Sequence, residues 1–487
     1  MVDINRRTLL RGAAVGAVGA AGPFAGFLSE RTSPRRTRLA ATADQRDGRV
    51  RLWLPDGFAY RSFHDTEQPV ELDDGTLLPG RPDGMAAFPG PDGSTVLIRN
   101  HEIKEPGPAF GPAAAAYDPM GAGGTSTVQV TRYGEVLRSY ASLSGTASNC
   151  CGGRMPWGAW ISCEETVNGP DVAPDYSGAP NIALTQRHGF IFEVPRQGRS
   201  AAEPITAAGR FSHESVAYDP REGVLYLTED NFKYASCFYR YLPPERVYAE
   251  AGTGRPGLAD GGRLQALRVA GRREANLAAA QRPGAVYPVE WVDIDDPAPT
   301  FPYTPGEPAP TGNDEALCHV GDQARERGAA WFSRLEGSVH HDGTVYFTST
   351  QGGGAPEESA GPAADGFGNG RGQIWAYQPR EQVLRLVFQA PHHDGLDFPD
   401  NITASSAGTL ILCEDGAHNN YVRGLTRDGR LLDIALNRIV SSVGDPRHRD
   451  EFAGAVFSPD GHTMFVNVQA ERGMTFAIWG PWPRLGV

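Results

Sequence analysis

Residues 223–230 read Gly-Val-Leu-Tyr-Leu-Thr-Glu-Asp, in which a glycine precedes an alternating apolar stretch that ends on acidic residues. Five other stretches share the alternating run and its polar end: TVLIRNHE (95–102), GAWISCEE (158–165), GTVYFTST (343–350), GTLILCED (408–415) and GHTMFVNV (461–468). Alternation with a period of two predicts β-strands. Because most of these strands recur roughly every 60 residues, the chain is predicted to contain a repeating β unit.

Each repeat also contains a second predicted strand and a short segment upstream of the first strand. The second strands lie at residues 126–132, 188–195, 237–243, 372–379, 420–427 and 474–481. Upstream segment, first strand and outer strands together make a four-stranded blade, and six such blades can close into a ring. We therefore predict an all-β, six-bladed β-propeller with short helical insertions, built as a single domain over residues 44–487.

The spacing between equivalent strands doubles between residues 229 and 349, and this gap contains two predicted helices. Apolar residues recur at helical spacing within residues 262–281. Residues 313–332 begin with a candidate N-cap and an acidic first turn. A helical insertion at about 244–332 is therefore favoured over a seventh blade.

The charge balance limits the classes of partner. The chain of 487 residues carries a formal net charge of −13. Such a charge argues against nucleic acid or an anionic membrane surface as a partner, and it suits a protein that binds cations. Of the six cysteines, Cys150 and Cys151 are adjacent and two others fall inside predicted strands, which argues against a disulfide framework.

The N-terminus is typical of an export signal. Residues 5–10 read Asn-Arg-Arg-Thr-Leu-Leu and precede an apolar stretch of small residues at 12–28. This pattern predicts a twin-arginine signal within residues 1–43 and passage through the twin-arginine translocation machinery. We expect a monomer in the periplasm, the cell envelope or the medium, and no later segment is apolar for long enough to predict a membrane span.

Acidic residues recur at two equivalent positions of the repeat. Aligned upstream segments place five positions together at the predicted channel mouth: Asp83, Cys150, Glu214, Glu336 and Asp400–Asn401. The sixth repeat offers only Phe-Ala-Gly at residues 452–454 there. The first strands end on further acids, among them Glu102, Glu164, Glu165, Glu229 and Glu414.

So many carboxylates around one axis would repel one another unless cations neutralise them. Oxygen donors in this number suit Ca²⁺, whereas the thiol of Cys150 suits iron or zinc. The sequence thus predicts a metal site in the central channel, and His213 beside Glu214 is a candidate supporting residue. No nucleophile elbow, Walker loop or dinucleotide-binding glycine motif is present.

Several motifs resemble the signature of the PhoX-type alkaline phosphatases. They are Asn-Cys-x-Gly-Gly-x-x-Pro-Trp-Gly at 149–158, Ser-Cys-Glu-Glu at 162–165, Asn-His-Glu at 100–102, Gly-Arg-Phe-Ser-His-Glu at 209–214, Leu-Glu-Gly at 335–337 and Pro-Asp-Asn at 399–401. The resemblance extends from the export signal to the last repeat. It implies a propeller that holds iron and calcium in its channel. It also implies an enzyme that hydrolyses phosphate monoesters.

The resemblance also implies roles for individual residues. Cys150 and Glu214 would bind iron, with Glu336 bridging or binding nearby, and Arg334 would hold the phosphate. The implied calcium ligands are Glu102, Glu164, Glu165, Glu229, Asp400, Asn401 and Glu414.

This chain departs from the family pattern at Cys151, where a small residue is usual, and it has no lysine shortly before Cys150. These departures leave two alternatives open. One is a calcium-dependent lactonase or phosphotriesterase, and the other is a non-catalytic scaffold made rigid by calcium.

Overall fold

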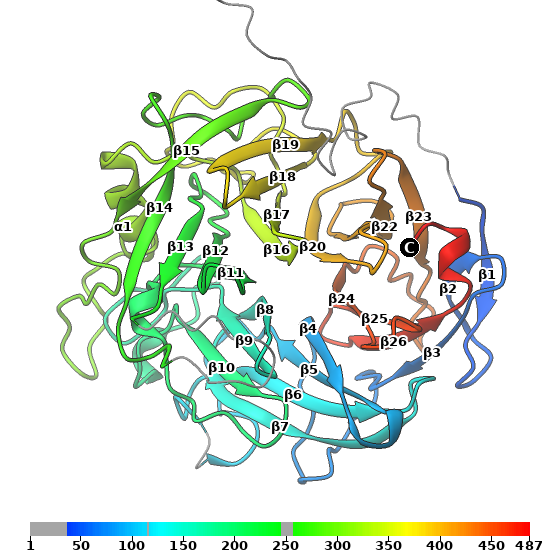
Figure 1. Ribbon diagram of the computed structural model, residues 1–487. Coiled ribbons are helices and arrows are strands. Elements are labelled where there is room, and N and C mark those ends of the chain that lie inside the picture. The colour runs from blue at the N-terminus through cyan, green and yellow to red at the C-terminus, as the bar shows by residue number, and fades with distance from the viewer. Residues whose placement is uncertain (1–36, 114–115, 245–256) are drawn as a thin grey trace, which may run out of the picture.

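The computed structural model describes residues 37–113, 116–244 and 257–487. Strands dominate this part of the chain, and the one α-helix within it is α1 (Asn313–Glu326). The sheets are arranged in a ring around a central axis (Figure 1). The prediction of an all-β, propeller-like fold is confirmed. The twin-arginine motif lies outside the described residues.

Two sheets come from consecutive strands. The first consists of β4 (Pro82–Pro89), β5 (Thr95–His101), β6 (Gly123–Val130) and β7 (Val136–Thr146). The second consists of β8 (Asn149–Met155), β9 (Ala159–Glu164) and β10 (Ile191–Pro195). All neighbouring strands pair antiparallel, as short connections between consecutive strands require.

A nine-stranded sheet joins the next two repeats. Its first half is β11 (His213–Asp219), β12 (Val224–Glu229), β13 (Tyr239–Leu242), β14 (Arg263–Val269) and β15 (Val286–Asp293). Its second half is β16 (Leu335–His341), β17 (Thr344–Ser349), β18 (Gln373–Gln378) and β19 (Val383–Gln389). The halves meet where β15 pairs with β19.

The structure corrects the prediction of a helix over residues 262–281, because this segment contains strand β14. Leu264, Ala266, Leu267 and Val269 are all buried, so apolar residues occupy both faces of the strand. Burial on both faces hides the period of two and leaves an accidental helical spacing. The second predicted helix is confirmed by α1.

The N-terminal strands complete the last two sheets. One contains β20 (Pro399–Ala404), β21 (Leu410–Glu414), β22 (Tyr421–Leu425), β23 (Leu431–Asn437), β2 (Val50–Pro55) and β1 (Leu39–Ala43). The other contains β24 (Phe452–Phe457), β25 (Thr463–Val468), β26 (Met474–Trp479) and β3 (Ala59–Phe63). Strand β1 thus belongs to the folded part of the chain, although the predicted domain began at residue 44.

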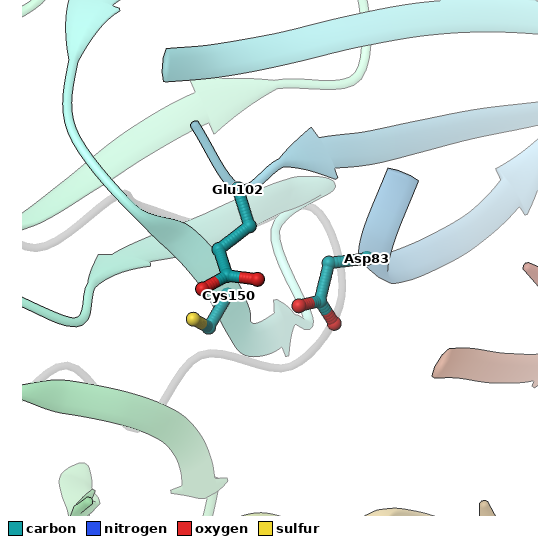
Figure 2. A group of neighbouring side chains, drawn as sticks. All are labelled: Asp83, Glu102 and Cys150. Carbon is teal, nitrogen blue, oxygen red and sulfur yellow. The ribbon is translucent and has the colours of Figure 1, made fainter. Parts of the chain in front are cut away.

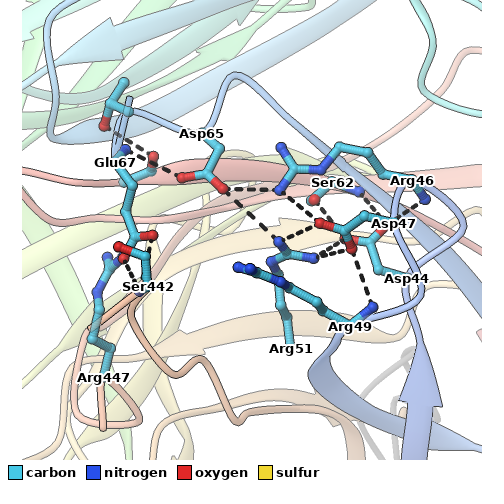
Figure 3. Close-up of polar contacts among 12 residues, drawn as sticks. Asp44, Arg46, Asp47, Arg49, Arg51, Ser62, Asp65, Glu67, Ser442 and Arg447 are labelled. Carbon is cyan, nitrogen blue, oxygen red and sulfur yellow. Dashed lines mark hydrogen bonds and ion pairs between the residues drawn. The ribbon is translucent and has the colours of Figure 1, made fainter. Parts of the chain in front are cut away.

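Buried ion pairs hold this closure together (Figure 3). The Arg51 guanidinium contacts the carboxylates of Asp44 at 2.8 Å and Asp47 at 2.7 Å. Asp44 also accepts a hydrogen bond of 2.5 Å from the hydroxyl of Ser62 on β3. The network therefore ties β2 to β3, which pair with β23 and β26 of two different sheets.

The segment upstream of each predicted first strand forms the inner strand of its repeat and lines the axis. Consecutive inner strands among β4, β8, β11, β16, β20 and β24 contact one another, and β24 contacts β4, which closes the ring. Hydrophobic clusters fill the spaces between the sheets; one of them joins Ile161 and Ile191 of the second sheet to Leu225 and Tyr239 of the third. This packing fixes the inner strands relative to one another.

Candidate metal centre

All six inner strands carry a β-bulge at the same level of the channel. On β8, Asn149 pairs with Glu164 and Gly152 with Ser162, so Cys150 and Cys151 together oppose one residue of β9. The equivalent register shifts lie between residues 82 and 85, 213 and 216, 335 and 338, 399 and 402, and 453 and 456. A bulge redirects a side chain out of the pleat. The first bulge residues are Asp83, Cys150, Glu214, Glu336, Asp400 and Gly454.

These bulges bring metal-binding side chains together, as their alignment in the sequence predicts. Four overlapping groups have ligand atoms within 4.8 Å of one another: Asp83, Glu102 and Cys150; Cys150, Glu165 and Glu214; Glu214, Glu336 and Asp400; and Asp400, Asp415 and Glu451. Successive groups share Cys150, Glu214 and Asp400. The nine residues therefore form one continuous donor cluster at the channel mouth.

Figure 2 shows the first group, in which the side chains of Asp83, Glu102 and Cys150 point toward one another from β4, the end of β5 and β8. The amide nitrogen of Asn100 donates to the carbonyl oxygens of Cys150 at 2.8 Å and Cys151 at 2.7 Å. Asn100 therefore fixes the backbone of the bulge that carries the thiol.

Two basic side chains contact the donor cluster. Lys104 Nζ lies 2.7 Å from Glu102 and 3.7 Å from Glu165. On the other side, the guanidinium of Arg334 lies 2.8 Å from Glu336 and 2.9 Å from Asp230. Two cations against so many acids leave the cluster with excess negative charge.

The excess charge raises the pKa of the acids. Burial, together with nearby carboxylates, raises the pKa of Glu165 to about 8 and of Asp400 to about 7. Burial and nearby carboxylates also raise the pKa values of Asp83, Glu214 and Glu336 well above their ordinary values. These groups ionise at neutral pH only if positive charge is supplied, and bound metal ions supply it.

An unpartnered atom tests whether the cluster fits metal ions. The buried Oδ1 of Asp83 has no hydrogen-bond partner among the described residues. A buried carboxylate oxygen without a partner is costly. The donors are eight carboxylates and one thiol, which suits hard and borderline divalent or trivalent ions. The residues present therefore fit the iron and calcium that the sequence motifs imply.

Three of the predicted carboxylate ligands for calcium lie outside the donor cluster. Glu164 accepts hydrogen bonds from His188 at 2.6 Å and from the backbone of the following loop. Glu229 accepts from the backbone nitrogen of Cys237 at 2.8 Å, and Glu414 accepts from Arg423 at 2.8 Å. These three glutamates are the last residues of β9, β12 and β21. Each accepts hydrogen bonds from residues of its own repeat.

The side chain of Asn401 forms hydrogen bonds to other protein groups. Its amide nitrogen donates to Asp400 Oδ1 at 2.6 Å, and its oxygen accepts from the backbone nitrogen of Gly454. The Nε2 of His213, the predicted supporting residue, donates to the carbonyl oxygen of Gly209 at 2.9 Å, and its ring stacks on Phe211. The His213 side chain does not belong to the donor groups.

Sequence reasoning missed Glu451 and Lys104. Glu451 directly precedes β24, one residue upstream of the segment in which an acid was sought. It compensates for Gly454, which has no side chain at the bulge. Lys104 lies two residues after Glu102, so a lysine does reach the site, although not from the segment before Cys150.

Two further findings bear on the site. All six cysteines lie within the described residues and are free thiols, in agreement with the argument from their spacing against a disulfide framework. None of the helices in the described ranges is long and apolar enough to cross a lipid bilayer.

The chain is similar to known proteins in sequence and fold. Residues 37–138 and 134–471 match the sequence profile of a family described as alkaline phosphatase PhoX. A structure of Pseudomonas fluorescens PhoX in complex with vanadate, a transition state analogue, superimposes with a TM-score of 0.63 at 17% identity, over 91% of this chain and 97% of that one. No curated protein sequence is significantly similar to the chain.

Two other structures align at lower scores. Virginiamycin B lyase from Staphylococcus aureus aligns with a TM-score of 0.36 at 13% identity, over 87% of this chain and 99% of that one. A gluconolactonase from Xanthomonas campestris aligns with a TM-score of 0.32 at 15% identity, over 86% of this chain and 99% of that one. Scores this low support no functional argument.

Proposed function

Because the chain belongs to the PhoX family of alkaline phosphatases, we propose that it hydrolyses phosphate monoesters at the donor cluster, with iron and calcium bound there. The observation that carries the proposal is the overlap of the four donor groups, which share Cys150, Glu214 and Asp400. Family membership supports phosphatase chemistry, and the donor cluster supports a place for the metal ions.

The donors divide by their chemistry. The groups that contain Cys150 offer sulfur together with oxygen, and such a set suits iron. Asp400, Asp415 and Glu451 offer carboxylate oxygens alone, which are the ligands that calcium takes. Bound metal ions would supply Lewis acidity toward the phosphate oxygens and charge to balance the carboxylates.

Arg334 is the residue placed to bind phosphate. Its guanidinium lies between Asp230 and Glu336 and stacks on the exposed ring of Phe232, with the guanidinium carbon 5.2 Å from the ring centroid. These contacts fix the planar guanidinium group of Arg334 at the edge of the donor cluster. A guanidinium held in this way can bind two phosphate oxygens at once and stabilise charge on them in the transition state.

Lys104 lies across the cluster from this group, against Glu102 and Glu165. We assign it to charge balance, because its amine already bridges two donor carboxylates. We assign Glu164, Glu229, Glu414 and Asn401 to positioning, because each is engaged in hydrogen bonds within the protein. Substrate would approach from the end of the channel that carries the donor cluster.

The deciding experiment is elemental analysis of the exported protein, with hydrolysis of p-nitrophenyl phosphate measured on the same sample. Iron and calcium together, with turnover lost to a chelator and restored by the metals, are the expected result. Calcium without iron and no turnover would contradict the phosphatase proposal and favour a calcium-dependent lactonase, a phosphotriesterase or a calcium scaffold.

The remaining expectations belong to the same proposal. The twin-arginine motif supports export to the periplasm, the envelope or the medium. The ring of inner strands supports a six-bladed count in which the nine-stranded sheet contributes two blades. Phosphate ester substrates and a monomeric state complete the proposal.

A further inference from the structure

A cavity of about 560 Å³ lies at the opposite end of the channel from the donor cluster. It is lined by the part of every inner strand that follows the bulge, together with adjoining turns: residues 85–87, 151–154, 216–218, 338–341, 401–406 and 454–461. We call it the far cavity. None of the nine residues of the donor cluster lines it.

The inner strands pack closely at the level of the bulges, between the far cavity and the donor cluster. A Cβ atom on Gly337 would lie 2.8 Å from the Cα of Asn401, and one on Gly84 would lie 2.5 Å from the Cα of Cys151. Neighbouring inner strands therefore touch directly at these two glycines. The amide of Asn401 closes the same level by accepting from the nitrogen of Gly454. The far cavity and the donor cluster thus have no residue in common.

The far cavity is lined by basic and hydroxyl groups. Arg154, His340 and His341 contribute to its wall, together with Ser338, Ser405, Ser406 and Ser458. Its one acidic lining residue, among those described, is Asp460, which already accepts hydrogen bonds from Ser458 at 2.6 Å and from the backbone nitrogen of His462 at 3.1 Å. In a chain of net charge −13, a hollow with this lining is unusual.

Several of these groups have unused donors. The hydroxyl of Ser338, a residue with 7% of its surface exposed, has no hydrogen-bond partner among the described residues. The buried Nε2 of His340 also has none, since its nearest carboxylate, that of Asp219, lies 3.7 Å away. Buried polar groups without partners in a roomy polar cavity point to a ligand or to water.

Arg154 supplies a charge without a counter-ion. Its guanidinium stacks over Phe88, 5.4 Å from the ring centroid, and forms no ion pair within the described residues. Burial without a neighbouring carboxylate lowers the pKa of Arg154, yet arginine remains protonated in proteins. This exposed guanidinium, which has no counter-ion among the described residues, can hold an anion beside it.

We propose that the far cavity binds a small oxyanion, of the class of inorganic phosphate or sulfate, through Arg154 with Ser338 and His340 as additional hydrogen-bond donors. The cavity is large enough for a tetrahedral anion with bridging waters. This site is separate from the phosphate position proposed at Arg334, and it does not depend on bound metal.

The test is equilibrium dialysis of radiolabelled inorganic phosphate against the metal-loaded protein at physiological ionic strength. We expect two phosphates per wild-type chain and one in Arg154→Gln, with affinity at the lost site reduced about tenfold or more, as loss of a charge-assisted contact predicts. His340→Gln should weaken the same site. Arg263→Gln, on an exposed arginine paired with Asp293 at 3.7 Å away from the far cavity, is the matched control and should bind two.

The outcomes separate the two proposals. Equal stoichiometry and affinity in wild type and Arg154→Gln would overturn the far-cavity site. If Arg334→Gln loses one bound phosphate and the double variant with Arg154→Gln loses both, the second phosphate is the one at the metal centre. One phosphate in wild type, lost in Arg154→Gln but kept in Arg334→Gln, would support the far cavity while counting against the proposed function.

Discussion

The Sγ atom of Cys150 lies 2.9 Å from Oε2 of Glu165 and donates a hydrogen bond to it. Burial, aided by the neighbouring carboxylates, raises the pKa of the Cys150 thiol well above its ordinary value. The thiol proton of Cys150 therefore lies between the sulfur and the carboxylate oxygen, where a metal ion bound by both groups would lie. Metal binding would therefore release this proton, so that loading becomes more favourable as the pH rises.

The two adjacent cysteines should respond oppositely to substitution. We expect Cys150→Ala to lower iron content to near zero and hydrolysis at least 100-fold, because the thiol is the sulfur donor in two of the four groups. Cys151→Ala should keep both, since Cys151 packs in a hydrophobic cluster with Trp160 and Phe192 and lines the far cavity. Elemental analysis and turnover on the same samples check this, and full iron loading of Cys150→Ala would contradict it.

Glu164 and Glu165 provide a second matched pair. Glu165→Gln should leave the fold intact but weaken metal binding about 10- to 100-fold, the range seen when a residue supporting a metal site is lost. Glu164→Gln should instead lower the free energy of unfolding by about 1–3 kcal/mol, because a fully buried carboxylate then loses part of its hydrogen bonding. Metal titration and urea unfolding distinguish the two effects. Equal metal affinities in the two variants would count against the assignment.

These two residues also show what the sequence could and could not reveal. The repeat made the bulge positions predictable, because Asp83, Cys150, Glu214, Glu336 and Asp400 occupy one register on their strands. At the strand ends the same reasoning could not succeed. Alternation makes adjacent acids point to opposite sides, and the side that faces the axis depends on the loop that follows.

The fold was predictable to a similar depth. Strands β5, β9, β12, β17, β21 and β25 followed from their alternation, but strand β14 did not, because both of its faces are buried. Its pairing with β13, and the pairing of β15 with β19, depend on contacts between distant segments. The role of β1 to β3 in closing the ring was hidden for the same reason, since their partners lie near the other end of the chain.

His188 predicts a pH dependence of stability. Burial alone would lower its pKa, but the carboxylates of Glu164 and Asp118 outweigh burial and raise the pKa to about 9. The folded pKa lies above the unfolded value near 6.5, so the stabilisation is complete below pH 6.5 and is lost as the pH rises through 9. The shift corresponds to about 3 kcal/mol.

The measurement is urea unfolding between pH 6 and 9.5 at fixed metal concentration. Wild type should lose stability across this window, and His188→Gln should start less stable and lose less. His462→Gln replaces a histidine at the surface and should retain the wild-type slope. Parallel pH profiles for wild type and His188→Gln would show that the ion pair does not control stability.

Arg51 should control closure of the ring. Its side chain is 6% exposed and contacts Asp44 and Asp47, so Arg51→Met leaves buried charge without a partner. We expect a loss of about 3–5 kcal/mol in the free energy of unfolding. Arg46→Met removes a more exposed partner of Asp65 and should cost about 1 kcal/mol or less. Thermal and urea unfolding compare the two variants, and similar losses in both would refute the special role of Arg51.

Arg334 should act through the shape of its guanidinium and not through its charge alone. Arg334→Lys keeps the charge but cannot contact Asp230, Glu336 and two phosphate oxygens together. We expect kcat/KM for p-nitrophenyl phosphate to fall about 100-fold or more, as loss of a preorganised transition-state contact does, with metal content unchanged. Arg371→Lys is the control.

Arg371 resembles Arg334 in its surroundings without contacting the donor cluster. Its guanidinium stacks 5.2 Å from the ring centroid of Phe398 and lies 3.4 Å from Asp397. Lysine at this position should therefore leave kcat/KM within about twofold of wild type, as is usual for exposed substitutions. If Arg334→Lys behaves like Arg371→Lys, the phosphate is held elsewhere. If Arg334→Lys also loses iron, the ion pair with Glu336 supports the metal site and the kinetic loss cannot be assigned to phosphate binding.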